Sequence, residues 1–464
     1  MSGVELSAFV RGTDRSAARL TAPVTTDLLG TDLRYYAVID GAAHLSSSVR
    51  ALARLLGRVT LNPLAPVEAL AFGFVLRDET VVREIRSIPP HSTLHPDGTL
   101  TSHEAPRTTA RTTDAALAVR RLRGVLEEVI AELEPRFDLH LAGFTGGKDS
   151  RILAALPKAA PGRWHWLSVS GRDDAEHRGS QLYAAQLRLE HAAWMEWTGD
   201  FLDGGVHRIS ADLANGVGAA SDYTLLRANF ERYRATLDGG SSALWIGTLA
   251  DALLAGTALA PPADNLWDAL APRTAHLPRL FAPQVLAQFE EGAYRTKGDA
   301  RLLRLLSRGR SFVCKGLASL DRVCPTQVNP YLHPALVELG LELDPRLLES
   351  DALRRGLLAD LGPGLDGPSA FGYRAPAYAE AVFRALAEEA RRCAPLGALV
   401  QPALLDDLHA GRFPELSPSA AGAGPAYRSH AAEPQPVVKS LRDYEHLLMY
   451  VTMVNLLAED GVLR

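Results

Sequence analysis

The stretch FDLHLAGFTGGKDSRILAA, residues 137–155, joins a short apolar run to a glycine-rich turn and the start of an amphipathic helix. Leu139–Phe144 is typical of a buried parallel strand, and apolar residues recur at helical spacing after Ser150. Glycines let the backbone come close to a ligand, and the N–H groups at a helix start bind anions. The stretch therefore predicts a phosphate-binding loop over Thr145–Ser150.

A carboxylate within an anion-binding loop is unexpected unless a cation joins it to the anion. Asp149 occupies such a position, so we expect Mg²⁺ to bridge it to a polyphosphate. The Walker pattern Gly-x-x-x-x-Gly-Lys-Ser/Thr is not present in this stretch. The loop instead resembles the Ser-Gly-Gly-x-Asp-Ser loop of the pyrophosphate-loop ATP enzymes, with Thr145 in the first position. The alternative is an ordinary Gly-Gly turn with a solvated helix start.

Length, charge and hydropathy limit the classes of protein. A chain of 464 residues predicts two to three domains, and a hydrophobic content of 47% is that of a globular protein. The formal net charge of −5 gives no electrostatic basis for nucleic-acid binding. The sequence shows no apolar run of membrane-spanning length and no signal-peptide pattern. We expect a cytoplasmic protein with no nucleic-acid or membrane partner.

Residues 1–110 are predicted to form a small β-rich domain. Strands are predicted at Leu33–Ile39, Ala71–Leu76 and Thr80–Ile88, and short helices at Ser47–Leu56 and Ala65–Ala71. Ser2 would become an N-terminal nucleophile if Met1 were removed, but serine is common at this position.

Residues 111–464 are predicted to form a second domain in which strands and helices alternate. A helix over Asp114–Leu133 precedes the loop, with Thr113 or Asp114 as its cap. Further strands are predicted at Trp164–Ser170, His191–Trp197 and Ala243–Ile246, with helices at Glu176–Leu187 and Thr224–Thr236 between them. This alternation predicts an α/β fold with a doubly wound parallel sheet. Because ligands bind beyond the carboxyl ends of such strands, Ser170-Gly171 and the glycine loop should face one pocket.

A second acidic residue follows the predicted strand at Ala243–Ile246. Gly247-Thr248-Leu249-Ala250-Asp251 comes directly after this strand. A carboxylate at this edge is well placed to share a metal ion with Asp149. The alternative is a plain helix cap, since Asp often begins helices.

An ordered set of motifs resembles the asparagine synthetase family, which includes the β-lactam synthetases and the lasso-peptide cyclases. The resemblance covers about residues 60–380. The matching segments are Ser87–His91, Thr145–Ser150, Ser168–Gly171, Ser221–Arg227, Gly247–Asp251, Asn329–Leu332 and Gly372–Pro376. The resemblance implies a pyrophosphate-loop synthetase domain preceded by a reduced, amidotransferase-like (Ntn-like) domain.

The chemistry that this resemblance implies is amide formation through an acyl-adenylate. A substrate carboxylate attacks ATP and expels pyrophosphate, and an amine then displaces AMP. By the same resemblance, Asp149 and Asp251 hold Mg²⁺. The residues implied to bind ATP are Thr145, Gly146, Gly147, Asp149, Ser150, Val169, Gly171 and Gly247, of which Val169 and Gly247 flank the adenine and ribose.

The chain departs from the family at the positions that supply and activate the amine. Ser2 replaces the cysteine of the glutamine-using members, so the amine is expected on the substrate itself. Thr248 stands where relatives carry Glu or Tyr, and threonine is a poor base at neutral pH. Ala370 replaces a lysine of the family, and Arg374 is a candidate substitute cation. We therefore assign Thr248 and Arg374 as the candidate catalytic residues.

The sequence thus predicts an ATP- and Mg²⁺-dependent ligase that joins a carboxylate and an amine of a small-molecule or peptide substrate. Ring closure in natural-product biosynthesis, as in lasso-peptide or β-lactam formation, fits best, with a biosynthetic partner protein as a further possibility. One alternative is a catalytically degenerate binding module, and another is a pyrophosphate-loop enzyme acting on a nucleic-acid base. Residues 417–436 are predicted to be a mobile loop, and a helix over Val438–Leu457 is expected to dock on the second domain.

Overall fold

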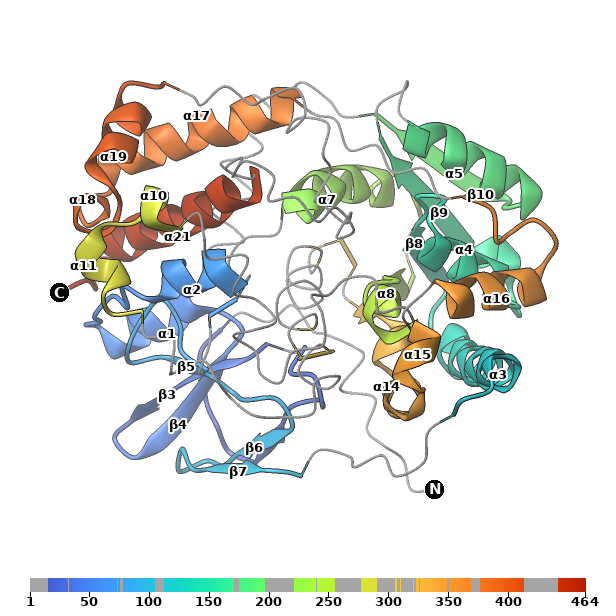
Figure 1. The fold of residues 1–464 in the computed structure, drawn as a ribbon. Helices are drawn as coiled ribbons and strands as arrows, with labels where there is room; N and C mark the ends of the chain where they lie inside the picture. Colours follow the sequence, from blue (N-terminus) through green and yellow to red (C-terminus); the bar gives the residue numbers. More distant parts are fainter. Residues whose placement is uncertain are drawn as a thin grey trace.

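A computed structural model shows a mixed α/β architecture with one five-stranded parallel sheet and two smaller antiparallel sheets (Figure 1). None of the described helices has the length and apolar character needed to cross a membrane. The structure describes residues 16–31, 33–72, 74–75, 78–104, 112–170, 175–196, 221–238, 240–254, 277–289, 305–306, 309, 320, 323–324, 326–348, 351–368, 376–412 and 441–464.

The parallel sheet contains the strand that leads into the glycine loop. Its strands are β8 (Leu139–Gly143), β9 (Trp164–Val169), β10 (His191–Met195), β11 (Ser242–Trp245) and β12 (Thr326–Val328). Every neighbouring pair is parallel, with Leu141 beside Leu244 and His165 in the registers of β8. The predicted α/β fold with a parallel sheet is confirmed. The fifth strand, β12, was not predicted, because three residues are too few to show a strand pattern.

The strand order across this sheet is β10-β9-β8-β11-β12. The chain therefore moves outward from β8 through β9 to β10, and then returns to the other side of β8 to form β11 and β12. In open α/β sheets, ligands bind beyond the carboxyl ends of the two strands at which the order reverses. Here those two strands are β8 and β11.

Helices pack on the sheet in the way that the alternating pattern predicts. In Figure 1, α4 and α5 lie on one side of the strands and α7 lies on the other. Asp114 caps α3, because its carboxylate accepts hydrogen bonds from the N–H groups of Ala116 and Leu117. The helices in this part of the chain are α3 (Ala115–Leu133), α4 (Lys148–Ala155), α5 (Ala175–Gln186), α7 (Ser221–Arg234), α8 (Ala250–Leu254), α14 (Pro334–Glu342), α15 (Pro345–Leu348) and α16 (Ala352–Leu361).

The early part of the chain forms the two antiparallel sheets. The four-stranded sheet has the order β1 (Ala18–Arg19), β4 (Ala42–Ser46), β3 (Tyr35–Ile39) and β5 (Arg86–Ser87). The three-stranded sheet has the order β2 (Val24–Thr25), β6 (Ser92–Leu94) and β7 (Leu100–Ser102). Helices α1 (Val49–Leu56) and α2 (Ala65–Phe72) confirm the two short helices predicted here.

One of the strands predicted in this region is wrong, and another is confirmed only in part. Ala71 and Phe72, predicted to start a strand, end α2 instead. Within Thr80–Ile88, only Arg86–Ser87 is a strand. The Thr80 hydroxyl donates hydrogen bonds to the carbonyls of Val82 and Ile85 and so folds this segment into turns. Such local side-chain bonds compete with a strand ladder, although the segment is rich in β-branched residues.

The last helix, α21 (Leu441–Glu459), packs against the early part of the chain. It contacts α1, α2 and α17 (Pro376–Arg392), and it also touches α7 (Figure 1). One hydrophobic core contains Tyr35 and Leu52 together with Phe383 and Val451. The expected docking on the second domain is therefore met through α17 and α7, and α21 also contacts α1 and α2 of the early part of the chain. Short helices α10 (Leu277–Leu280), α11 (Pro283–Leu286), α18 (Leu396–Leu399) and α19 (Pro402–His409) lie in the same part of the structure.

We expect the substitution Asp460→Asn to weaken the attachment of α21 to α1. The Asp460 carboxylate accepts hydrogen bonds from Arg50 Nε at 2.6 Å and from Arg54 Nε at 2.8 Å. Because the Arg54 side chain is 57% exposed and that of Arg50 only 17%, Arg50 should contribute most. The expected cost is about 1–2 kcal/mol of unfolding free energy at pH 7.

The bonds from Arg50 and Arg54 to Asp460 should also make the stability of the protein depend on pH in acid. Hydrogen bonds from Arg50, and then from Arg54, hold the pKa of Asp460 well below its ordinary value. A lowered folded-state pKa stabilises the protein above the unfolded-state pKa of about 4, and this stability is lost as the pH falls further. Thermal unfolding of the wild type and of Asp460→Asn at pH 7 and pH 3 measures this effect. The difference in stability between the two proteins should be smaller at pH 3. Asp407→Asn, which breaks an exposed pair with Arg412, is the control and should change little.

Candidate active site

The predicted phosphate loop joins β8 to α4, as expected. Thr145 Oγ1 accepts a hydrogen bond from the Gly147 N–H at 3.1 Å. Ser150 Oγ donates to the Gly147 carbonyl at 3.0 Å. Gly147 occupies the cap position of α4, and no side chain caps this end of the helix. The first N–H groups of α4 are therefore available to an anion.

Gly146 has a backbone conformation and a position that only glycine tolerates well. Its φ is +70°, in the left-handed region. A Cβ atom at this position would lie 2.7 Å from the carbonyl carbon of Gly179 in α5 and 2.8 Å from its oxygen. The loop therefore packs directly against the backbone of α5, and this close contact fixes the path of the loop.

The segment after β11 lies directly beside the loop. A Cβ atom on Gly247 would stand 3.7 Å from the Asp149 carbonyl oxygen and 3.9 Å from the Asp149 Cβ. Leu249 is fully buried with φ +86°, an uncommon conformation for a residue with a side chain. This turn starts α8, and the Asp251 carboxylate accepts a hydrogen bond from the Ala252 N–H at 2.9 Å.

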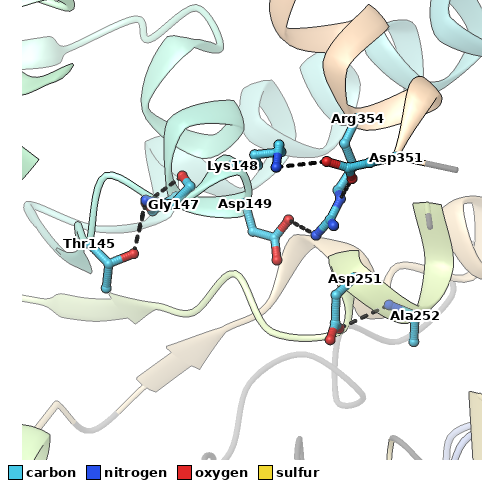
Figure 2. A network of polar contacts seen from close by, with 9 residues as sticks. Thr145, Gly147, Lys148, Asp149, Asp251, Ala252, Asp351 and Arg354 are labelled. Carbon is cyan, nitrogen blue, oxygen red and sulfur yellow. Dashed lines mark hydrogen bonds and ion pairs between the residues drawn. The ribbon is translucent and has the colours of Figure 1, made fainter. Parts of the chain in front are cut away.

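Asp149 and Asp251 are near enough to affect each other electrostatically. The pKa of Asp149 is raised, first by burial, and the negative charge of Asp251 adds to the rise, while Arg354 opposes it. Figure 2 shows both carboxylates at the loop edge, with Asp149 between the loop and Arg354. The structure therefore brings together the two residues that the sequence predicted as metal ligands.

A chain of ion pairs connects this loop to the start of α16. Arg354 Nη1 lies 3.0 Å from Asp149 Oδ1, and Arg354 Nε lies 2.6 Å from Asp351 Oδ1 (Figure 2). Lys148 Nζ lies 2.7 Å from Asp351 Oδ2. Flanking carboxylates outweigh the effect of burial and raise the pKa of Arg354, so its guanidinium stays charged. The sequence analysis missed Arg354 and Asp351, because their spacing from the loop in the chain gives no signal that they reach it.

Tyr331 places an unpaired hydroxyl beside this network. Its side chain is fully buried, and its hydroxyl has no hydrogen-bond partner among the residues that the structure describes. Burial raises the pKa of Tyr331 well above 10, and the charge of Asp149 raises it further, so the hydroxyl remains a donor. A buried hydroxyl without a partner is costly, which suggests that a ligand atom completes it.

Thr248, the candidate catalytic residue after β11, is held by Asn329. Asn329 Nδ2 donates to the Thr248 carbonyl at 2.8 Å and to Thr248 Oγ1 at 3.0 Å. Asn329 follows β12, so the carboxyl ends of β11 and β12 are linked here. The contact orients the threonine but does not make its hydroxyl a base.

The remaining predicted site residues divide into two groups. Val169 ends β9, and its side chain is buried in the core of the sheet, which leaves its backbone for ligand contact. The neighbouring Ser170 Oγ accepts a hydrogen bond from Trp194 Nε1 at 3.0 Å. Gly171 and Arg374 lie outside the residues that the structure describes, as do Ala370 and the predicted mobile loop at 417–436.

The carboxylates of Asp149 and Asp251 suit an Mg²⁺ ion that is also held by substrate phosphates. No group of three or more His, Cys, Asp or Glu side chains that could hold a metal occurs in the described ranges. Mg²⁺ often binds to only one or two carboxylates, together with water and substrate phosphates. Asp149 and Asp251 provide two carboxylates at the edge of an anion-binding loop, so these residues fit the ion when it arrives with a polyphosphate.

Comparison of the chain with protein-family models found no matching family, and comparison with curated proteins found no significant match. The fold and the site therefore define the class of protein only as mixed α/β, with a glycine loop and paired carboxylates at the carboxyl edge of a parallel sheet.

Proposed function

We propose that this chain is an ATP-dependent synthetase that adenylates a substrate carboxylate and joins it to a substrate amine. The observation that carries the proposal is the convergence of two segments at the reversal of the strand order. Thr145–Ser150 follows β8 and Gly247–Asp251 follows β11, and Gly247 lies against Asp149. A phosphate-binding loop beside two acidic residues is the arrangement that magnesium–nucleotide chemistry requires.

In the proposed reaction, the loop holds the β- and γ-phosphates that leave as pyrophosphate. The N–H groups of the first turn of α4 would face the developing negative charge. The Gly147 N–H and the Ser150 hydroxyl, which donate to Thr145 Oγ1 and to the Gly147 carbonyl, would hold the loop in shape. When bound, Mg²⁺ on Asp149 and Asp251 would neutralise part of this charge. The substrate amine then attacks the adenylated carbonyl, forms the new C–N bond and releases AMP.

The same proposal assigns the parallel sheet to a pyrophosphate-loop synthetase domain. It assigns residues 1–110 to a reduced, Ntn-like amidotransferase domain. The early antiparallel sheets support a β-rich unit, and Ser2, where glutamine-using relatives have cysteine, supports a substrate that carries its own amine. A small molecule or peptide with both a carboxylate and an amine would then be closed into a ring, as in lasso-peptide or β-lactam formation.

A binding module without turnover is a second candidate, and one observation favours it. Asn329 Nδ2 donates a hydrogen bond to Thr248 Oγ1. A threonine hydroxyl is a poor base even without such a bond. In that case the site would bind the nucleotide but leave the amine without a base. The two candidates agree on ATP binding and differ in the release of pyrophosphate.

We expect Asp149→Asn to weaken Mg²⁺-dependent ATP binding by at least about tenfold, because the neutral amide cannot hold the cation. Titration calorimetry with ATP, with and without Mg²⁺, measures this change. Asp138→Asn is the matched control. Asp138 lies just before the first residue of β8, at the opposite end of the strand from the loop, and its carboxylate accepts a hydrogen bond from Ser241. Equal ATP affinity in all three proteins would refute the proposed site. Pyrophosphate release with pooled amino-carboxylate substrates then separates an enzyme from a binding module.

A further inference from the structure

Arg354 occupies the place where a cation would neutralise the acidic pair. Its side chain is only 12% exposed, and its Nη1 lies 3.0 Å from Asp149 Oδ1. Asp149 lies beside Asp251 and its side chain is 28% exposed, and two neighbouring carboxylates repel each other unless a positive charge lies between or beside them. In the structure, the Arg354 guanidinium supplies that positive charge to Asp149.

The guanidinium has a second anchor that would survive release from Asp149. Arg354 Nε lies 2.6 Å from Asp351 Oδ1, and Asp351 is itself held by Lys148. A guanidinium has five N–H donors in a rigid plane, so it can keep the Nε bond while its Nη atoms change partner. The arrangement lets Arg354 turn about Asp351 rather than leave the site.

The Tyr331 hydroxyl is a buried donor without a described partner beside this network. This hydroxyl is buried and lies within electrostatic reach of both Asp149 and Arg354. Among the described residues, no group accepts its hydrogen bond. An oxygen of a bound ligand, such as a phosphate oxygen or a water held by a cation, would satisfy it.

We propose that Arg354 is an internal counterion that exchanges places with a divalent cation. When the cation binds to Asp149 and Asp251, Arg354 gives up its bond to Asp149, keeps its bond to Asp351, and donates its freed N–H groups to a phosphate oxygen. Arginine is suited to the second role because its planar donors match phosphate geometry. The phosphate half of this inference rests on the proposed ATP-dependent function, whereas the cation half does not.

The exchange predicts opposite effects of Arg354→Gln on two ligands. Removing the competing charge should make Mn²⁺ alone, used as a probe for divalent cations, bind about tenfold more tightly. Removing the phosphate partner should make ATP bind about tenfold more weakly at saturating Mg²⁺. A residue with a merely structural role would weaken both ligands or neither.

Mn²⁺ binding is measured by electron paramagnetic resonance of the free ion, and ATP binding by calorimetry. Arg355→Gln is the matched control, since Arg355 is the next residue of α16 and is exposed. Arg354→Lys keeps the charge but loses the planar fork, so Mn²⁺ affinity should stay near that of the wild type while ATP affinity falls. Circular dichroism checks that each variant is folded.

Each outcome decides one part of the inference. Mn²⁺ affinity that is unchanged or weaker in folded Arg354→Gln would overturn the exchange. Tighter Mn²⁺ binding, together with undiminished ATP affinity, would overturn the phosphate role alone. If the wild type binds no ATP but Arg354→Gln still binds Mn²⁺ more tightly, the proposed function fails while the cation exchange stands.

Discussion

Gly146→Ala is expected to abolish detectable ATP binding and to destabilise the protein. The new methyl group would enter the space of the Gly179 backbone, 2.7 Å from its carbonyl carbon, and backbone atoms cannot rotate away as a side chain can. The left-handed φ of +70° adds conformational strain. Together these effects should cost about 3–4 kcal/mol of unfolding free energy. A displaced loop should also lower ATP affinity by at least about 100-fold.

Gly41→Ala separates the clash from the strain. Gly41 has φ +72°, almost the same value, but no atom lies within 4 Å of the position of its Cβ. Its replacement should therefore cost only about 1 kcal/mol, from backbone strain. Thermal unfolding and ATP calorimetry on both variants test the comparison. If the two substitutions prove equally mild, then the close approach of the loop to α5 does not fix the path of the loop.

Arg151→Met is expected to have the largest effect on stability. Arg151 follows the loop by one residue and is fully buried in α4. Its Nη1 donates to the Leu365 carbonyl and its Nη2 donates to the Gly367 carbonyl at 2.9 Å, while the guanidinium lies 3.9 Å from the centre of the Tyr183 ring. Methionine would fill most of the volume but leave two buried carbonyls without these donors. We expect a loss of about 3–5 kcal/mol.

The control for this substitution is Arg123→Met. Arg123 also reaches the α16 region, through Asp360, but it lies at the surface. Exposed pairs contribute about 0–1 kcal/mol, so this variant should unfold near the wild-type temperature. A fall of several degrees for Arg151→Met and none for Arg123→Met is the expected result. Equal unfolding temperatures in the two variants would show that the buried guanidinium is dispensable.

Local sequence patterns were sufficient to predict the parallel sheet and the position of the loop. Leu139–Ala142 is a continuous buried run, and the glycines of the loop break the pattern clearly. Asp114 was predicted as a possible cap of α3, and its carboxylate fills that role. These features depend on residues that are close together in the chain.

The parts of the site that were missed depend on long-range contacts. Arg354 reaches Asp149 across 205 residues of sequence, and Asn329 reaches Thr248 across 81 residues. Tyr331 belongs to a segment on which the sequence resemblance was based, but only the structure shows that its hydroxyl is buried without a described partner. Single-sequence patterns carry no information about which distant side chains meet.

The core that joins the early strands to α17 and α21 has a consequence for how this chain folds during synthesis. Tyr35 and Leu52 leave the ribosome long before Phe383 and Val451, which belong to the same core. At about 5–20 residues per second, this delay lasts on the order of tens of seconds. During that time the apolar surface of the early strands lacks its native cover and is open to aggregation or to a chaperone. The early unit can complete its native core only after translation has passed Val462.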